Sequence, residues 1–165
     1  KQWFKKSAEF DKAVNDTLAP YLEPAACGDL DSWLNHPRAA LALIILLDQV
    51  PRNLFREDAR RFNYDEKALK SAHVALELGH DKSIKSQRER SFFYLPFEHS
   101  EALEDQIRCC ELMADLEEYP DLLKWAEMHR KVIERFGRFP HRNAFLGRES
   151  SDEEAAFLKE PGSSF

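Results

Sequence analysis

The sequence predicts an all-α fold made of antiparallel helix pairs. Apolar residues recur at helical spacing along most of the chain, and only five glycines interrupt its 165 residues. No segment alternates apolar and polar residues for long enough to form a strand. Because 43% of the residues are hydrophobic, a chain of this length can bury a substantial core, and we expect residues 1–165 to form a single all-helical domain.

The first two predicted helices differ in how much of their surface is apolar. An amphipathic helix is indicated by four residues spaced four apart: Phe10, Val14, Leu18 and Leu22. Ser7 is its expected N-cap, and Pro20 is expected to kink or break it. The second helix is expected to begin at Pro37 and to end at Val50, before Pro51. It is apolar on all sides, which predicts a buried central helix.

Three further helices are predicted in the middle of the chain. The third covers residues 65–78 and stops at Gly79, and a short fourth covers residues 87–94. Ser100 is the expected N-cap of the fifth. Its predicted inner stripe consists of Leu103, Ile107, Cys110 and Ala114.

Two helices complete the prediction. The sixth begins at Pro120 and closes at Gly137. Its predicted apolar face consists of Leu122, Trp125, His129, Val132, Ile133 and Phe136. Ser151 and Glu154 have the spacing of a capping box, which predicts a short helix through Lys159.

The composition of the chain argues against several classes of protein. The net charge of −6 argues against a general nucleic-acid binder, which usually carries a basic surface. The longest apolar run, residues 39–47, is too short to span a bilayer, so no membrane association is expected. Three cysteines, Cys27, Cys109 and Cys110, form neither a disulfide framework nor paired zinc spacing. Reduced thiols predict a cytoplasmic protein, and no cofactor is expected.

Positive charge is concentrated in one segment of this acidic chain. Residues 129–148 contain six Lys and Arg residues against one acid, a net charge of +5. Several of these cations follow Gly137 in a loop that Pro140 stiffens, and loops on a rigid scaffold often hold ligands. Arg138, Arg142 and Arg148 can make bidentate contacts with a carboxylate or phosphate. Alternatively, they pair with acids of the same chain.

A second polar stretch, L-D-Q-V-P-R-N-L-F-R, ends the apolar helix. Asp48 would be costly to bury unpaired, so we expect an arginine beside it. Gln49, Arg52, Asn53 and Arg56 complete the stretch, which resembles the later P-H-R-N segment at residues 140–143. Either these residues form an internal clamp between helix ends, or they contribute to a ligand site.

The third polar stretch is E-H-S-E. His99 lies between Glu98 and Glu101, so a carboxylate could hold one imidazole tautomer for acid–base catalysis. The same acids also suit the first turn of a helix, where they need no function. No second histidine follows at helical spacing, so no metal site is predicted. His129 is expected to be a core residue that hydrogen-bonds a neighbour such as Gln106.

Four motifs follow one another along the chain: L-L-D-Q-V-P-R-N, Y-L-P-F-E-H-S-E, R-F-G-R-F-P-H-R-N-A-F-L-G-R and P-G-S-S-F. In this order they resemble the motifs of the bacterial domain-of-unknown-function 924 family. The resemblance covers nearly the whole chain. It implies a tetratricopeptide-like α-α superhelix, and a further helix before residue 1. It brings no assigned reaction.

These observations leave three functional hypotheses. The first is a scaffold that binds an anionic small molecule or an acidic peptide. Its expected ligand-binding residues are Asp48, Gln49, Arg52, Asn53, Arg56, Glu101, Arg138, Arg142, Asn143 and Arg148. The second is a small hydrolase or transferase in which His99 or His141 is the acid–base group and Glu98 assists. No established catalytic motif supports it. The third is a purely structural or assembly role.

Overall fold

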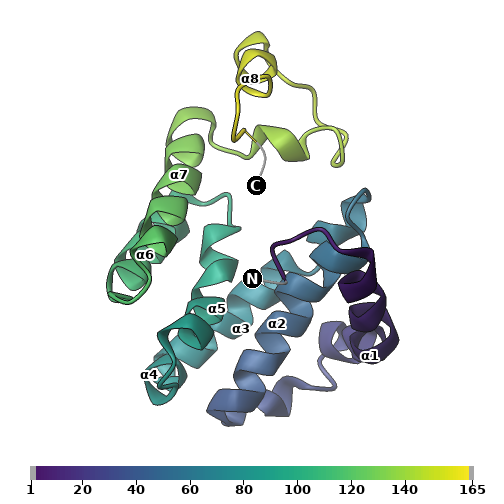
Figure 1. The fold of residues 1–165 in the computed structure, drawn as a ribbon, viewed down its shortest axis with the longest axis vertical. Coiled ribbons are helices and arrows are strands. Elements are labelled where there is room, and N and C mark those ends of the chain that lie inside the picture. The colour runs from purple at the N-terminus through teal and green to yellow at the C-terminus, as the bar shows by residue number, and fades with distance from the viewer. Residues whose placement is uncertain (1–2, 164–165) are drawn as a thin grey trace.

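A computed structural model describes residues 3–163, and within them the fold is helical with no strand. The all-α prediction is therefore confirmed. The elements in chain order are α1 (Ala8–Cys27), the 3-10 helix η1 (Asp31–Asn35), α2 (Pro37–Leu54), η2 (Ala59–Phe62), α3 (Asp65–Glu77), α4 (His80–Ser83), α5 (Gln87–Glu98), α6 (Leu103–Ala114), α7 (Pro120–Phe136), η3 (Pro140–Arg142) and α8 (Asp152–Phe157) (Figure 1). No helix among these residues has both the length and the apolar character needed to cross a membrane.

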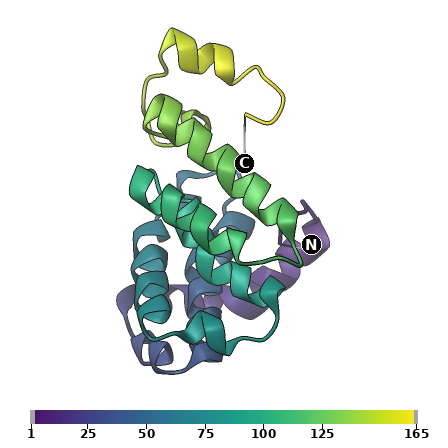
Figure 2. The same cartoon turned by 90° about the vertical axis from the view of Figure 1, so that its left-hand side faces the viewer.

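Consecutive long helices pack against one another, which is consistent with an α-α superhelix. α1 packs on α2, α2 on α3, α5 on α6, and α6 on α7, while α5 also contacts α2 and α3 (Figures 1 and 2). The main core lies between these layers and includes the fully buried rings of Phe93 and Phe97. α2 is the buried central helix that its all-apolar surface predicts, since Leu43, Ile44 and Leu47 have no exposed surface.

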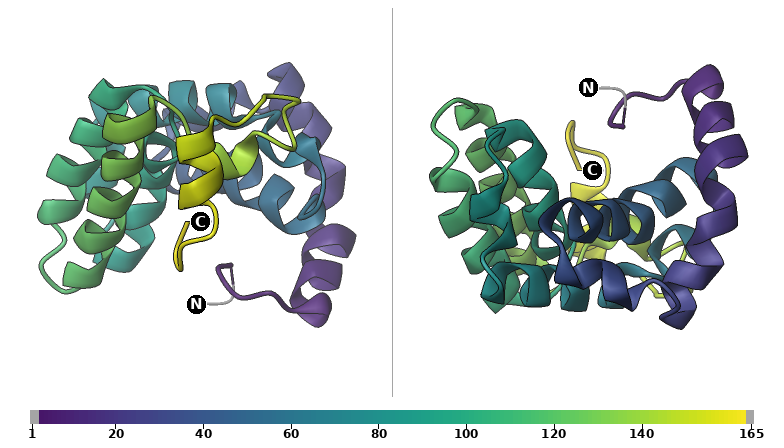
Figure 3. Two further views of the ribbon diagram at one scale, coloured as in Figure 1. Left: turned by 90° about the horizontal axis from the view of Figure 1, so that it is seen from above. Right: turned by 90° about the horizontal axis from the view of Figure 1, so that it is seen from below.

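The segment after α7 returns across the ends of the other helices. Gly137 ends α7 with φ of +67° and donates its N–H to the carbonyl of Ile133, as predicted for a C-terminal glycine. The chain then passes through η3 and α8, and the view from above shows α8 over the middle of the molecule (Figure 3). Ser151 and Glu154 form the predicted capping box, although α8 ends at Phe157 and not at Lys159.

Proline does not break the helices where the sequence predicts. α1 continues through Pro20 to Cys27, α2 continues past Pro51 to Leu54, and α5 continues through Pro96 to Glu98. In α2, side chains support the last turn: Arg52 donates to the carbonyl of Asp48 at 2.7 Å, and Asn53 donates to that of Gln49 at 2.9 Å. These bonds and the burial of Pro51 offset the loss of one backbone N–H.

Two predictions about α6 are wrong. Its N-cap is Ala102, while Ser100 accepts from the Ala102 N–H and donates to Asp105 from outside the helix. The buried face is also rotated by one residue, because Leu103 and Ile107 are exposed. Cys110 is buried as predicted, and Gln106, Cys109 and Met113 are buried in place of the exposed residues. The single polar residue on this face, Gln106, donates to the carbonyls of Phe97, Glu98 and Ser100, which close the end of α5.

The predicted apolar face of α7 is only partly correct. His129, Val132 and Ile133 are buried, but the indole of Trp125 is half exposed. The Nδ1–H of His129 donates to the carbonyl of Trp125 at 2.9 Å, one turn earlier in the same helix. His129 is thus a buried, hydrogen-bonded residue as expected, and this bond is made within α7.

Candidate functional site

Asp48 and His99 form a close pair where α2 and α5 end. Asp48 is 1% exposed, and the Nδ1–H of His99 donates to its Oδ1 at 2.6 Å. Gln49 donates to the other oxygen at 2.7 Å, and Nη1 of Arg52 lies 3.3 Å from Oδ1. Burial alone would raise the pKa of Asp48, but His99 and Arg52 hold it well below its usual range. Asp48 is therefore an ionised carboxylate, and the expected arginine is beside it.

Arg52 and Arg142, which are distant in the sequence, meet at Asp65. Arg52 donates to both oxygens of Asp65, at 2.8 and 3.0 Å. Nη1 of Arg142 lies 3.5 Å from Oδ2 of Asp65, and Nη2 donates to the carbonyl of His99 at 2.9 Å. Asp65 is the first residue of α3, where the helix dipole also favours a negative charge. Arg52 thus joins the end of α2 directly to α3, and Arg142 joins the 137–148 segment to α3 and to the end of α5.

Arg142 is a buried cation with one long carboxylate contact among residues 3–163. Its side chain is 8% exposed, and its guanidinium carbon lies over the rings of Phe62 and Phe139, 4.8 and 4.5 Å from their centroids. Burial lowers its pKa to about 10; the charge of Asp65 opposes this shift, and the smaller effect of Arg52 adds to it. Its Nε has no hydrogen-bond partner among residues 3–163. Arg142 remains charged at neutral pH with one long carboxylate contact.

Glu101 and Arg148 fasten the 137–148 segment to the turn after α5. Arg148 donates to both oxygens of Glu101, at 2.7 and 3.0 Å, and the backbone N–H of Phe139 donates to Oε1 at 2.8 Å. Burial would raise the pKa of Glu101, but the bonds from Arg148 and Phe139 lower it overall. Glu101 is therefore ionised and already has a guanidinium partner.

Glu98 and His129 form a second acid–histidine contact beside the first. Oε1 of Glu98 lies 3.7 Å from Nδ1 of His129, and both residues are buried. Burial and the charge of Asp48 raise the pKa of Glu98 to about 8, against the opposing effect of Arg52. Burial lowers the pKa of His129 to about 3. Both groups are neutral near pH 7, so this contact is not an ion pair.

Four other predicted residues lie at the margins and have partners there. Arg56 donates to both oxygens of Asp11, at 2.7 and 2.6 Å, and to the amide oxygen of Asn53 at 2.8 Å. Arg138 donates to both oxygens of Glu154, at 2.6 and 2.8 Å. These arginines clamp α1 to α2 and the segment after α7 to α8. Asn143 is buried and donates to Ser150.

His141 is not part of the Asp48–His99 pair. Its ring packs on the Phe139 ring, with centroids 5.6 Å apart, and burial together with the charge of Arg142 lowers its pKa to about 3. Two residues that the sequence analysis did not name also belong to this region. Asp65 joins Arg52 and Arg142, and Arg61 donates to the carbonyl of Arg56 with its pKa lowered by burial and by Arg52. The R-R-F-N-Y-D spacing before α3 was the available signal for both.

We call the resulting group the central charge cluster. It consists of Asp48, Arg52, Arg61, Asp65, Glu98, His99, Glu101, Arg142 and Arg148. Four guanidiniums face three ionised carboxylates, because Glu98 is largely protonated near neutral pH. Solvent reaches its edge, where the side chains of Asp65, Arg148 and Glu101 are 19%, 24% and 28% exposed. The cluster thus has one more positive charge than negative.

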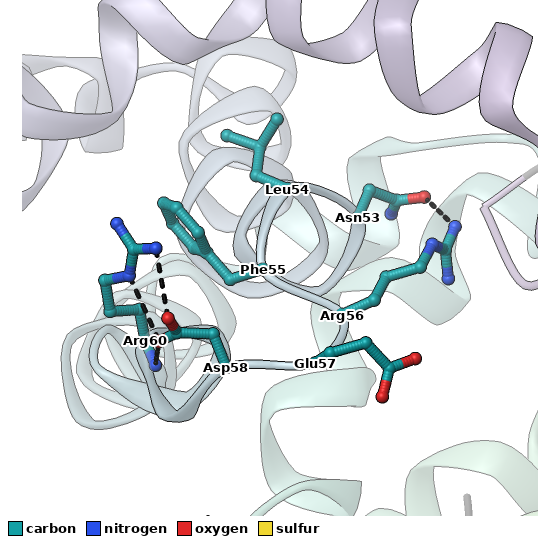
Figure 4. A pocket seen from close by; sticks show the side chains of 7 residues that line it. All are labelled: Asn53, Leu54, Phe55, Arg56, Glu57, Asp58 and Arg60. Carbon is teal, nitrogen blue, oxygen red and sulfur yellow. Dashed lines mark hydrogen bonds and ion pairs between the residues drawn. The ribbon is translucent and has the colours of Figure 1, made fainter.

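A separate hollow of about 380 Å³ lies beside the cluster, after the end of α2. Its walls include Asn53, Arg56 and Arg60, and Figure 4 shows Arg56 bonded to Asn53 on one side and Arg60 bonded to Asp58 on the other. Each bordering arginine thus has its own carboxylate, Asp11 or Asp58. Within the part of the chain described, no group of three or more His, Cys, Asp or Glu residues could hold a metal ion.

Comparison with known proteins gives a family and a close structural relative. Residues 1–162 match the family model described as "Bacterial protein of unknown function (DUF924)". A solved structure of a protein of unknown function from Agrobacterium tumefaciens is 44% identical in sequence, with a TM-score of 0.91. The match covers 95% of this chain and 88% of that one. No curated protein matches this chain significantly.

Proposed function

The chain belongs to the DUF924 family of bacterial proteins of unknown function, and from this premise we propose that it is a helical scaffold that binds a small carboxylate at the central charge cluster. The supporting observation is Arg142, a buried guanidinium with one carboxylate oxygen 3.5 Å away and an Nε without a partner in residues 3–163. A guest monoanion would neutralise the surplus positive charge of the cluster. Its carboxylate matches the planar fork of arginine.

The residues around Arg142 are polar and partly exposed. Asp65, Arg148 and Glu101 at the rim keep contact with solvent, while the rings of Phe62 and Phe139 both contact the guanidinium. Arg52 and Arg148 are both engaged with carboxylates, so they contribute long-range attraction and Arg142 makes the direct contact. We also propose a tetratricopeptide-like shape and a cytoplasmic location for this protein. The three free cysteines support the cytoplasmic location.

Calorimetric titration with acetate, propionate, benzoate and succinate tests the proposal. We expect a carboxylate to bind with a dissociation constant below millimolar, and Arg142→Gln to weaken binding by about ten- to a hundredfold. Arg135→Gln is the matched control, since this exposed arginine pairs with Glu153 away from the cluster. Equal binding by the two variants, or no binding by the unmodified chain, would exclude the site.

A second candidate function rests on the Asp48–His99 pair. Asp48 fixes the Nδ1–H tautomer of His99, and the His99 side chain is 14% exposed, so Nε2 is the atom that can accept a proton. Burial lowers the pKa of His99, so the ring is neutral at pH 7 and able to act as a general base.

Hydrolysis of p-nitrophenyl acetate and p-nitrophenyl phosphate tests this second candidate. If His99 is the base, His99→Gln should lower kcat/KM by about a hundredfold or more. His73→Gln, at a half-exposed histidine, should leave the rate unchanged. Undetectable turnover by the unmodified chain, or equal rates in both variants, would reject a hydrolase.

A further inference from the structure

A second polar hollow, of about 340 Å³, lies among α3, α4, α5 and α6, away from the end of α5 that carries His99. It is framed by Leu76, Asp81, Arg90, Tyr94, Leu112 and Asp115. Arg90 and Tyr94 are one turn apart on α5, so they share one face, and Arg90 precedes His99 by nine residues, or about 13 Å along a helix. The hollow is therefore distinct from the central charge cluster.

Asp81 gives this hollow a buried negative charge. Its side chain lies just after the sharp turn at Gly79, and the residue is 3% exposed. Its one hydrogen-bond donor among the described residues is the hydroxyl of Tyr94, which donates to Oδ2 at 2.9 Å. No lysine, arginine or histidine of residues 3–163 comes within ion-pair distance of it. A buried carboxylate with a single neutral donor is costly unless a cation approaches it.

Arg90 provides the opposite charge across the same space. Its Nη2 donates to the carbonyl of Ile84 at 3.2 Å, and its Nε is buried without a partner in the described part of the chain. No carboxylate among these residues forms an ion pair with it. Arg90, Tyr94 and Asp115 all line this hollow. The lining also includes the exposed Lys82 and the Arg108–Glu111 ion pair. Asp81 and the Nε of Arg90 are the buried charged groups of this lining that have no ion-pair partner among the described residues.

We propose that this hollow binds a small zwitterion with the chemistry of a free α-amino acid. Its ammonium group would bind Asp81, with Asp115 nearby, and its carboxylate would bind Arg90 through the guanidinium fork. Leu76 and Leu112 form the apolar part of the wall, which favours an aliphatic side chain. The volume suits a ligand of this size and lies at the small end of ordinary ligand sites. This inference is independent of the carboxylate site at Arg142.

A saturation-transfer NMR screen of the twenty amino acids against the full chain, followed by calorimetry, tests the proposal. We expect an aliphatic amino acid such as leucine or valine to bind. The matching amine, isopentylamine, and the matching acid, 4-methylpentanoate, should each bind at least about tenfold more weakly, because each lacks one charged contact. An amine or acid that binds as tightly as the amino acid would overturn the zwitterion assignment.

Variants on α5 localise the binding. Arg90→Gln should weaken amino-acid binding by about ten- to a hundredfold, and Arg90→Lys should restore part of it because a cation remains. The matched control is Arg88→Gln, on the same helix but facing Tyr119 outside the hollow. Circular dichroism melts verify that each variant is folded. If Arg90→Gln unfolds, the amino-acid affinity of Arg90→Lys relative to the Arg88→Gln control tests the proposal by itself. Equal affinities in the folded Arg90 variants and the Arg88 control would overturn the proposal.

Discussion

Asp48→Ala is expected to lower the free energy of unfolding by about 3–5 kcal/mol, the usual cost of removing one partner from a buried ion pair. The substitution leaves Arg52 and His99 without the carboxylate that both contact, and it opens a space at the end of α2. Because the pKa of Asp48 is depressed in the folded state, its contribution is complete above the unfolded pKa of about 4. It is lost as the pH falls below that value.

Urea unfolding at pH 7 and at pH 3 measures this effect. Asp16→Ala on the outer surface of α1 is the matched control, because the Asp16 side chain is 52% exposed. The difference between the two variants should be several kcal/mol at pH 7 and smaller at pH 3. A cost below about 1 kcal/mol at pH 7, as for a surface ion pair, would contradict a buried, ionised Asp48.

Glu98→Gln is expected to have the opposite effect and to stabilise the protein above neutral pH. The pKa of Glu98 is about 8 in the folded state, so the folded chain keeps a proton that the unfolded chain loses above pH 4.5. Between these values the unmodified protein loses stability with rising pH, by at most about 1.4 kcal/mol per pH unit. Glutamine has a similar shape and does not ionise, so the variant escapes this loss.

Thermal melts of Glu98→Gln and the unmodified chain from pH 5 to pH 8 test this expectation. The variant should gain over the unmodified protein as the pH rises, while Glu66→Gln, at an exposed glutamate on α3, should show no such trend. A constant difference across the range, or a variant that becomes relatively weaker at pH 8, would show that Glu98 is already ionised.

The sequence predicted the helices well because their signals are local. Gly79 and Gly137, both with positive φ, follow the ends of α3 and α7 as expected, and Ser7 caps α1. Proline positions were misread partly because the burial of neighbouring residues, which supports the helix around Pro51, is a tertiary effect. The bonds from Arg52 and Asn53 to carbonyls one turn earlier are local to α2, and the sequence analysis overlooked them. The α6 face was misread because Gln106, a polar residue, is buried where it closes the end of α5.

The candidate site was predicted in part. Sequence reasoning assigned Asp48, Arg52 and Arg142 to one expected ligand site and His99 to a separate catalytic hypothesis. The structure places all four side chains around Asp65 and the end of α5. It could not distinguish which arginines would be neutralised, because pairing depends on contacts far apart in the chain. Arg56 and Arg138 each have a bidentate carboxylate partner, whereas Arg142 has only a long contact. Asp65 was read as a helix start alone.

The central claim is that Arg142 accepts a monoanion, and bromide soaked into crystals of the unmodified chain and of Arg142→Gln tests it most directly. The claim predicts an anomalous bromide peak at hydrogen-bonding distance from the Arg142 guanidinium, absent in the variant. Bromide peaks at exposed lysines and arginines with none at Arg142 would contradict it.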